Sequence, residues 1–444
     1  MLKTFPLGGV HPPENKLSED RQIETLPLPA QVVIPVSQHI GAPALPTVEK
    51  GQKVKAGEII AAAKGYVSAN IHSSVSGKVN KIDLAIDSSG YKQTSITIDV
   101  EGDEWLETID RSETLVKESN LSGADIVKRC LESGIVGLGG ATFPSHVKLS
   151  LPPGKKCDIL IINGVECEPY LTSDHRLMLE KSDELLVGIT LLMKALGTGR
   201  AIIGIENNKP DAISLLSGRV KNYPGISVQP LKVKYPQGGE KQLIKALINR
   251  EVPSGGLPID VGTVVHNVGT TVAVYEAVQK NKPLFERVVT ITGKAVANPG
   301  NYRVRIGTPV SHLIEAAGGI PGNTGKIVNG GPMMGKAINS TSAPVIKGTS
   351  GIILFPEGES ERPVSGPCIR CSKCISVCPM GLEPYLLMIL TEKEMLDKAE
   401  TNKITDCMEC GSCSYTCPAG RPLLDYIRLG KSRVMKIIRE RKSK

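Results

Sequence analysis

The chain carries the run Cys368-Ile-Arg-Cys371-Ser-Lys-Cys374-Ile-Ser-Val-Cys378-Pro379 and repeats its pattern as Cys407-Met-Glu-Cys410-Gly-Ser-Cys413-Ser-Tyr-Thr-Cys417-Pro418. Each run has the spacing C-x2-C-x2-C-x3-C-P, which is typical of bacterial [4Fe-4S] sites. In such pairs the fourth cysteine of one run binds the other cluster. The sequence therefore predicts two clusters with interleaved ligands: Cys368, Cys371, Cys374 and Cys417 for the first, and Cys378, Cys407, Cys410 and Cys413 for the second.

Two other uses of cysteine compete with this prediction. Pairs of the form C-x2-C also bind zinc, and cysteines also form disulfides. Two identical four-cysteine runs, each closed by proline, fit two cubane clusters better than either alternative. A cubane accepts one electron at a time, so the runs indicate a one-electron carrier in a reducing compartment. The other cysteines, Cys130, Cys157 and Cys167, have no ligand spacing and are expected to be small buried apolar residues.

Length and composition narrow the class of protein. A chain of 444 residues is too long for one hydrophobic core and predicts several domains. Its start lacks the apolar segment of a signal peptide, and no stretch of about 18 apolar residues would cross a bilayer. The net charge of +8 is dispersed, and only 3% of residues are aromatic, which argues against nucleic-acid binding. We expect a protein that is free in solution or peripheral to a membrane.

The N-terminal quarter predicts an arm followed by a β module. Residues 1–28 are rich in proline, which excludes a regular helix and favours an extended arm packed on the rest of the protein. Residues 29–105 contain short β-rich segments separated by glycine turns. This stretch resembles the barrel-sandwich hybrid of biotinyl and lipoyl carriers. Its hairpin, Lys64-Gly65-Tyr66, lacks the residues that flank a modified lysine, so a structural role is expected.

Residues 106–285 predict a Rossmann-like α/β domain. A glycine-rich loop at 134–148 could bring backbone amides close to an anion. The apolar run at 157–163 predicts a buried parallel strand, and a helix at 179–196 and a strand at 200–206 follow it. Polar residues follow each strand, and ligands of open α/β sheets bind at those strand ends. Further helix and strand segments are expected at 241–249 and 264–267.

These motifs, in this order, resemble the FMN- and NADH-binding subunit of respiratory complex I. The resemblance implies that FMN binds to the glycine loop and the strand ends, with hydride exchange beside Glu168, Phe143 and Glu240. Two positions depart from that family's pattern, because Leu138 replaces an arginine and Gly239 replaces a glutamate. The implied cofactor-binding residues are Gly137, Gly139, Gly140, Lys148, Asn163, Glu166, Tyr235, Gly238, Asn267 and Thr270.

The last third predicts two more domains. Residues 286–350 resemble the β-grasp, or SLBB-like, domain that follows the flavin domain in complex I. Residues 351–444 hold both cysteine runs, and the segment between the runs, 383–403, has apolar residues along one helical face. A helical linker favours an α-helical two-cluster ferredoxin domain. A second helix is expected at 423–438, and its basic tail, which runs to Lys444, would suit a partner or an anionic membrane surface.

The opening Gly8-Gly-Val-His-Pro-Pro-Glu-Asn-Lys16, together with the doubled cysteine runs, resembles the C subunits of Rnf complexes, which couple ferredoxin and NAD to ion transport. The resemblance implies an FMN-containing, NAD(H)-reacting subunit at the cytoplasmic face of the cell membrane. It would pass single electrons between FMN and membrane subunits, with a ferredoxin-like subunit among its partners. The alternatives are a cluster-bearing scaffold without a nucleotide site and a soluble NADH-dependent reductase that works alone.

Overall fold

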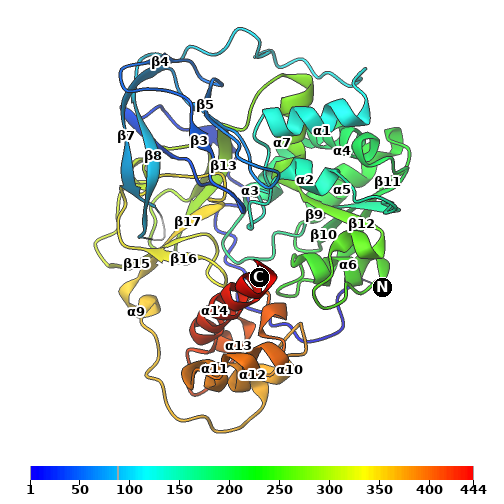
Figure 1. The fold of residues 1–444 in the computed structure, drawn as a ribbon, viewed down its shortest axis with the longest axis vertical. Helices are drawn as coiled ribbons and strands as arrows, with labels where there is room; N and C mark the ends of the chain where they lie inside the picture. The colour runs from blue at the N-terminus through cyan, green and yellow to red at the C-terminus, as the bar shows by residue number, and fades with distance from the viewer. Residues whose placement is uncertain (1, 88–89, 444) are drawn as a thin grey trace.

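The computed structural model describes residues 2–87 and 90–443. Its described strands form sheets of six, four, four and three strands. Figure 1 shows the β-rich units on one side, the α/β unit on the other, and the C-terminal helices below both. The predicted combination of multidomain α/β and β architecture is confirmed.

The barrel-sandwich unit follows an extended arm. In the arm, β1 (Ile23–Thr25) pairs in parallel with a strand of the six-stranded sheet. Two sheets, ordered β2-β8-β7-β4 and β3-β5-β6, then enclose a core that includes the fully buried Val32, Ile34 and Ile96. The strands are β2 (Gln31–Pro35), β3 (Leu45–Pro46), β4 (Lys53–Val54), β5 (Ile59–Ala62), β6 (Ile71–His72), β7 (Gly77–Ile86) and β8 (Lys92–Val100).

The α/β unit is built on a parallel sheet of order β11-β10-β9-β12. The inner strand β9 is buried on both faces, because Leu160 and Ile162 pack into one apolar core and Ile161 packs into another. The strands are β9 (Ile159–Gly164), β10 (Ala201–Glu206), β11 (Ile226–Leu231) and β12 (Thr263–Asn267). The helices are α1 (Gly123–Glu132), α2 (Ser145–Leu149), α3 (Ser173–Glu180), α4 (Ser182–Leu196), α5 (Pro210–Arg219), α6 (Glu240–Ile248) and α7 (Val268–Gln279), with 3-10 turns at Val220–Asn222 and Pro258–Val261.

The single helix predicted at 179–196 is wrong at its start. The structure has α3 and α4, which are separated at Lys181, where the backbone leaves the helical region (φ −124°, ψ 32°). The apolar spacing did not reveal this break, because both helices bury residues in the same core, including Met178 and Leu185. The predicted strand at 200–206 and the helix at 241–249 agree with β10 and α6 to within one residue.

The β-grasp unit has the six-stranded sheet of order β1-β14-β13-β17-β15-β16 and one helix packed on it. Its elements are β13 (Glu286–Thr292), β14 (Gly300–Arg305), α8 (Val310–Ala316), β15 (Thr324–Asn329), β16 (Lys336–Ile338) and β17 (Gly351–Pro356). The strand β17 lies between β13 and β15. The predicted end of this unit at residue 350 therefore falls one strand short, because the pairing that completes the sheet is not visible in sequence.

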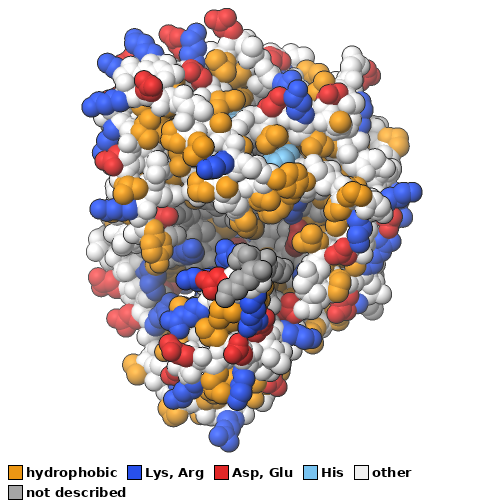
Figure 2. Space-filling model, in the orientation of Figure 1, with side chains coloured by type: hydrophobic (Ala, Val, Ile, Leu, Met, Phe, Trp, Pro, Cys, Tyr) orange, Lys and Arg blue, Asp and Glu red, His pale blue; other side chains and the backbone are white. Residues whose placement is uncertain are grey.

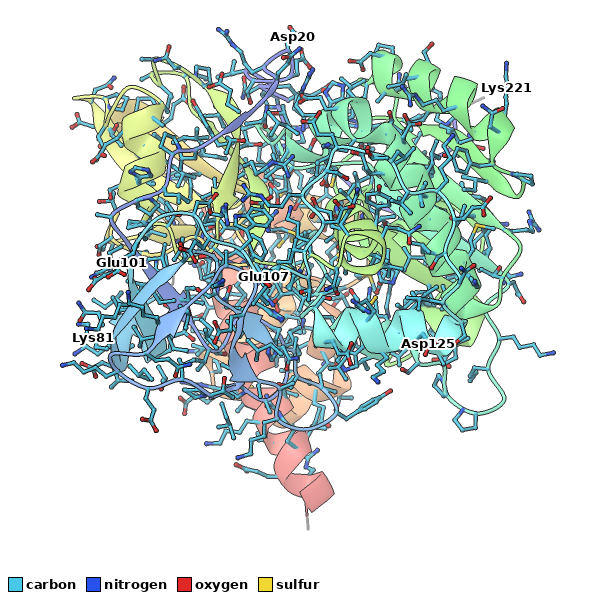
Figure 3. All side chains as sticks on the ribbon, turned by 90° about the horizontal axis from the view of Figure 1, so that it is seen from above. Asp20, Lys81, Glu101, Glu107, Asp125 and Lys221 are labelled. Carbon is cyan, nitrogen blue, oxygen red and sulfur yellow. The ribbon has the colours of Figure 1, made fainter. Side chains whose placement is uncertain are left out.

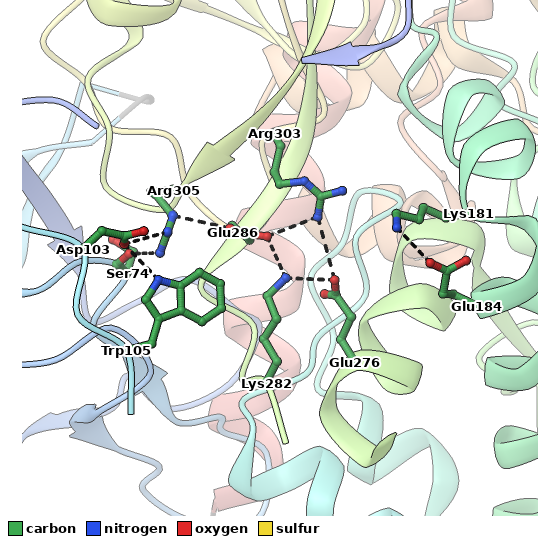
Figure 4. A network of polar contacts seen from close by, with 10 residues as sticks. All are labelled: Ser74, Asp103, Trp105, Lys181, Glu184, Glu276, Lys282, Glu286, Arg303 and Arg305. Atoms are coloured by element: carbon green, nitrogen blue, oxygen red, sulfur yellow. Dashed lines mark hydrogen bonds and ion pairs between the residues drawn. The ribbon is translucent and has the colours of Figure 1, made fainter. Parts of the chain in front are cut away.

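A buried ion network joins the three N-terminal units. Glu286 on β13 accepts from Lys282 at 2.6 Å and from Arg303 at 3.2 Å, and Arg305 lies 3.4 Å away (Figure 4). Arg305 also reaches Asp103 of the barrel-sandwich unit at 2.9 Å. Burial disfavours the Glu286 carboxylate, but the surrounding cations lower its pKa to about 2. Because the charges are shared between units, the network fixes how those units meet.

The C-terminal unit is helical, as predicted. Its helices are α9 (Glu357–Ser360), α10 (Lys373–Ser376), α11 (Pro384–Glu392), α12 (Leu396–Thr401), α13 (Ser412–Tyr415) and α14 (Leu423–Ser443), with a 3-10 turn at Ile404–Asp406. The continuous helix predicted at 383–403 is wrong, since the chain turns between α11 and α12 with Glu394 at φ 55°. The turn lets both short helices pack against α14, where Leu387, Ala399 and Ile427 share one core.

The surface carries both signs of charge. Lys, Arg, Asp and Glu are interspersed over the face shown in Figure 2, in keeping with the dispersed charge of the sequence. Seen from above, Lys81 and Glu101 of the barrel-sandwich unit lie at the opposite edge from Lys221 of the α/β unit (Figure 3). The predicted basic tail is the C-terminal part of α14, which extends past the predicted end at 438 to Ser443, and Lys444 lies outside the described residues. Within 2–87 and 90–443, no helix has the length and apolarity to span a bilayer.

Candidate functional site: two thiol sets and a glycine-rich loop

The predicted second ligand set lines one cavity. Cys378, Cys407, Cys410 and Cys413 surround it, and apolar side chains close the remaining wall, including Leu382, Leu387, Leu424 and Ile427. Three of the thiols come from the second run, and Cys378 comes from the first. A cubane needs four thiolates around a compact space, so these residues fit one. Burial and the neighbouring thiol of Cys410 raise the pKa of Cys407 to about 12, which an iron cluster would offset.

The first ligand set lies nearer the surface. Cys368 and Cys371 are exposed, whereas Cys374 and Cys417 are half-buried. Burial raises the pKa of the Cys374 thiol, and the nearby Cys417 and Cys368 raise it further. The structure therefore brings a residue of the second run, Cys417, to the thiols of the first. Among the described residues, no three His, Cys, Asp or Glu side chains converge on a position for a single metal ion.

The two cysteine loops share one backbone conformation. Arg370 and Ser372 in the first loop have positive φ angles of 55° and 59°. Glu409 and Gly411 in the second loop occupy the same places in the repeat, with φ angles of 61° and 79°. Each loop then enters a short helix, α10 or α13, and these two helices pack together. The repeat seen in the sequence is thus a repeat of structure.

The glycine loop lies at the carboxyl ends of β9 and β12. The Gly137 amide donates to the Phe143 carbonyl at 2.9 Å and closes the loop. The Leu138 amide donates to the Thr270 hydroxyl at 2.8 Å and ties the loop to α7. Gly140 has φ 137° and no atom within 4 Å of the place where a Cβ would be, so the loop presents open backbone on that side. Such a surface fits a flavin phosphate or ribityl chain.

Polar groups from α2, α6 and β9 lie near the same strand ends. Lys148 on α2 donates to Glu240 at the start of α6 (2.7 Å) and to the Val265 carbonyl (3.1 Å). Asn163, on β9, donates to the Gly238 carbonyl at 2.9 Å. These contacts bring Lys148, Asn163, Gly238 and Glu240 close together. Their binding of FMN remains a prediction.

Asn267 completes this edge as the N-cap of α7. Its side chain accepts from the Thr270 amide and donates to Asp174 at 2.6 Å. A Cβ on Gly139 would lie 3.1 Å from the Asn267 side chain, so a larger residue would crowd the loop. The ring Nε2 of His266 is buried and has no partner among the described residues, and burial lowers the pKa of His266 to about 3. A neutral imidazole with an unused nitrogen beside Lys148 suits a polar ligand at this edge.

Glu166 and Glu168 make contacts of a different kind. The Glu166 carboxylate accepts from the amides of Asp174 (2.8 Å) and His175 (3.0 Å), so it caps the start of α3. The Glu168 carboxylate accepts from the amides of Met333 at 3.0 Å and Met334 at 2.9 Å. These bonds engage both carboxylates within the protein. The predicted flavin contact of Glu166 and the predicted role of Glu168 at the hydride site remain predictions.

Glu168 and Tyr235 lie where three units meet. The Tyr235 hydroxyl is 3.4 Å from Glu168 and donates to the Cys410 carbonyl at 2.8 Å. Desolvation raises the pKa of Glu168 to about 7, against the lowering effect of its amide donors. The cofactor contact that the resemblance implies for Tyr235 remains a prediction, and in the structure the Tyr235 hydroxyl donates to the second thiol loop. It therefore couples the α/β unit to the helical unit.

Two basic residues escaped the prediction from sequence. Lys16 donates to the carbonyls of Glu166, Glu168 and Leu171 at 2.9, 3.0 and 2.7 Å, which holds the loop after β9. Arg287 reaches the Leu138 carbonyl of the glycine loop at 3.4 Å. Lys16 ends the opening motif and could have been singled out there. Arg287 lies in an ordinary strand pattern, and nothing in the sequence marks it.

Comparison with known proteins identifies the family. A family model named the RnfC barrel sandwich hybrid domain matches residues 3–103, and the Nuo51 FMN-binding domain matches 130–276. An SLBB domain matches 288–337, and a 4Fe-4S dicluster domain matches 364–418. Over 437 residues the chain is 47% identical to the C subunit of the proton-translocating ferredoxin:NAD(+) oxidoreductase complex of Clostridium ljungdahlii, covering 97% of this chain and 94% of that one. This chain belongs to the RnfC family.

Other RnfC relatives agree. The C subunit of the Na(+)-translocating ferredoxin:NAD(+) oxidoreductase complex of Acetobacterium woodii is 44% identical, with 96% of each chain covered. The C subunit of the ion-translocating oxidoreductase complex of Rhodobacter capsulatus is 42% identical, and the match covers 87% of this chain and 75% of that one. The expected family and the four expected kinds of domain are confirmed. The individual site residues remain predictions.

One solved structure shares the fold of this RnfC chain over much of its length. It is an NAD+-reducing [NiFe]-hydrogenase in the H2-reduced state, with a TM-score of 0.50 and 19% identity. The match covers 70% of this chain and 63% of that chain. At this identity the likeness concerns the fold alone.

Proposed function

We propose that this chain is the NAD(H)-reacting electron-transfer subunit of a membrane-bound, ion-translocating ferredoxin:NAD+ oxidoreductase complex. The observation that carries the proposal is one cavity lined by Cys378 of the first run and Cys407, Cys410 and Cys413 of the second, in a chain whose residues 130–276 match an FMN-binding domain. When bound, FMN exchanges a hydride with NAD(H), and [4Fe-4S] clusters accept single electrons. Other subunits of the complex, including a ferredoxin-like one, would be its partners, and it would lie peripherally at the cytoplasmic face of the membrane.

The residues at the strand ends would have different roles in binding FMN and NAD(H). Gly137, Gly139, Gly140, Asn163 and Thr270 would hold the flavin through backbone and polar side-chain contacts at the carboxyl ends of β9 and β12. Lys148 would supply positive charge to an anionic group, and Glu240 would orient Lys148 through their 2.7 Å pair. Phe143, which is half-buried, would offer an apolar face to the nicotinamide.

The burial of the two thiol sets supports an order between them. Cys378 and Cys410 are buried, and Tyr235 of the α/β unit donates to the Cys410 carbonyl. Cys368 and Cys371 are exposed. We place the buried set next to the flavin unit and the exposed set toward the redox partner, because a partner can approach the exposed set more closely.

The test is a visible spectrum of anaerobically purified protein with quantified iron and flavin. We expect two [4Fe-4S] clusters and one FMN per chain, and the protein should oxidise NADH in the presence of an artificial acceptor. Protein with clusters but neither flavin nor NADH oxidation would instead favour a scaffold. Fully active protein that never co-purifies with membrane subunits in detergent would favour a reductase that works alone.

A further inference from the structure

The N-terminal arm runs between the α/β unit and the C-terminal helices. Figure 1 shows this segment passing close to α6 and to the helical unit. Phe5 anchors it to the α/β unit, since its side chain is buried and its ring lies 4.2 Å from the ammonium of Lys234. The Lys232 amide donates to the Lys3 carbonyl at 2.9 Å, which extends the edge of the parallel sheet. The first residues of the arm are therefore part of the α/β unit.

The next residues contact the first cysteine run directly. The Gly9 amide donates to the Val377 carbonyl at 2.9 Å. A Cβ added at Gly8 would lie 2.6 Å from the carbonyl carbon and oxygen of Cys378 and from the Val377 oxygen. All of these atoms belong to the backbone, so a side chain at this position could not be accommodated without moving the chain around Cys378. Gly8 thus permits a close approach of the arm to a predicted ligand of the buried set.

Val10 then returns the arm to the strand end at Tyr235. The Val10 amide donates to the Tyr235 carbonyl at 2.8 Å, and the Tyr235 amide donates to the Val10 carbonyl at 2.9 Å. Tyr235 in turn donates to the Cys410 carbonyl, and Val10, Tyr235 and Cys410 share one apolar cluster. Within three residues the arm is therefore bonded on both sides of the buried thiol set, at Val377–Cys378 and, through Tyr235, at Cys410.

We propose that Gly8, Gly9 and Val10 form a clamp that positions the buried thiol set against the α/β unit. The rate of electron transfer between two sites depends on the distance between them. The arm forms main-chain hydrogen bonds both to the first cysteine run, at Val377, and to the α/β unit, at Tyr235. The inference rests on the proposed function for its consequence, which is fast electron transfer from the flavin site. The contacts of the clamp are a matter of packing, so their presence can be tested without NADH.

The variant Gly8→Ala tests the clamp, with Gly154→Ala as the matched control. Both glycines have positive φ, 67° and 78°, so both substitutions strain the backbone, but a Cβ at Gly154 meets nothing within 4 Å. After reduction with dithionite, the Gly8→Ala protein should show a lost or altered electron paramagnetic resonance signal for the buried cluster. Its flavin content should equal that of the parent. Bleaching of the clusters by NADH should slow about tenfold or more. Gly154→Ala should match the parent in each measurement.

Hydrogen exchange of the unaltered protein gives a second test that does not depend on a variant folding. The amides of Gly9 and Val10 should exchange about a hundredfold or more slower than free peptide, because both are bonded across the unit boundary. Unprotected amides would overturn the clamp. So would a Gly8→Ala protein whose iron content, resonance signal and bleaching rate equal the parent's, or a Gly154→Ala protein changed to the same degree. A parent protein without flavin would refute the proposed function alone, since the exchange and dithionite measurements would still report on the arm.

Discussion

The hydroxyl of Tyr235 donates a hydrogen bond to the backbone carbonyl of Cys410 across 2.8 Å. Tyr235 follows the α/β sheet after the end of β11, and Cys410 belongs to the second thiol loop, so the bond joins the two units that the proposed function needs to connect. Both residues are buried. A buried hydrogen bond between units fixes their relative position as well as stabilising them.

Replacing Tyr235 with Phe should weaken this junction. The change removes the donor and leaves the Cys410 carbonyl without it, which costs about 1–3 kcal/mol for a buried group. We expect a lower thermal midpoint of unfolding and slower reduction of the buried cluster by NADH, measured by calorimetry and stopped-flow absorbance. The control is Tyr91→Phe, which alters an exposed side chain. Equal midpoints and equal rates in the Tyr235 variant and the parent would contradict this interpretation of the contact.

The interleaved ligand assignment predicts a specific pattern of iron loss. Cys378→Ala removes a ligand from the set that includes Cys407, Cys410 and Cys413, so about half of the iron should be lost while flavin stays bound. Cys374→Ala should instead lose the iron of the first cluster, which is the other half. The loss is measured by quantifying iron and flavin in the two variants and by recording their electron paramagnetic resonance spectra. Cys130→Ala, at a buried cysteine of the α/β unit, is the control. Two intact clusters in the Cys378 variant would refute the assignment.

Lys148 should contribute to flavin affinity through its charge. Lys148→Gln removes a cation from the strand-end site. Loss of a charge-assisted bond of about 1.5–3 kcal/mol corresponds to roughly a 10- to 140-fold larger dissociation constant. Fluorescence titration of flavin-depleted protein with FMN measures the change. Lys155→Gln is the control, since Lys155 pairs with Asp260 on the surface at 2.9 Å. An unchanged dissociation constant would place the flavin phosphate elsewhere.

Glu206 should make the stability of the folded protein depend on pH. Burial raises the pKa of Glu206 from 4.5 to about 7, although Lys209 and Lys16 lower it in part. Its folded pKa lies above the unfolded value, so the native state binds the proton more tightly, and stability falls as pH rises from about 4.5 to about 7. The glutamine of the Glu206→Gln variant cannot ionise. The thermal midpoint of the variant should therefore rise relative to that of the parent as the pH increases from about 5 to about 8.

The control for this pH series is Glu251→Gln, which changes an exposed carboxylate that lies 3.7 Å from Lys245. Its midpoint relative to the parent should stay constant over the same range. The energy at stake for Glu206 is on the order of 3 kcal/mol, which the midpoint would register. A difference that does not change with pH would show that Glu206 is ionised throughout, with Lys209 and Lys16 outweighing its burial.

Several features were readable because short-range chemistry dictates them. The spacing of the cysteine runs, from Cys368 to Cys417, predicted two loops of one kind, and the positive φ angles at Arg370 and Glu409 show that the loops repeat. The apolar run of β9 predicted a buried parallel strand, because both faces of such a strand must exclude water. Lys148 and Glu240 were expected to lie close together because polar residues that follow parallel strands meet at one edge of the sheet, and the two side chains are in contact.

The sequence by itself determined the chemistry of this protein, through the two cysteine runs and the glycine loop, because ligand type and spacing are local properties of the chain. Only the tertiary structure decided how the parts meet. It bonded Glu168 to the amides of Met333 and Met334, completed the β-grasp sheet with β17, and bonded Gly9 of the arm to Val377. These contacts join residues far apart in the chain, and which buried donor meets which acceptor depends on the packing of all the units together.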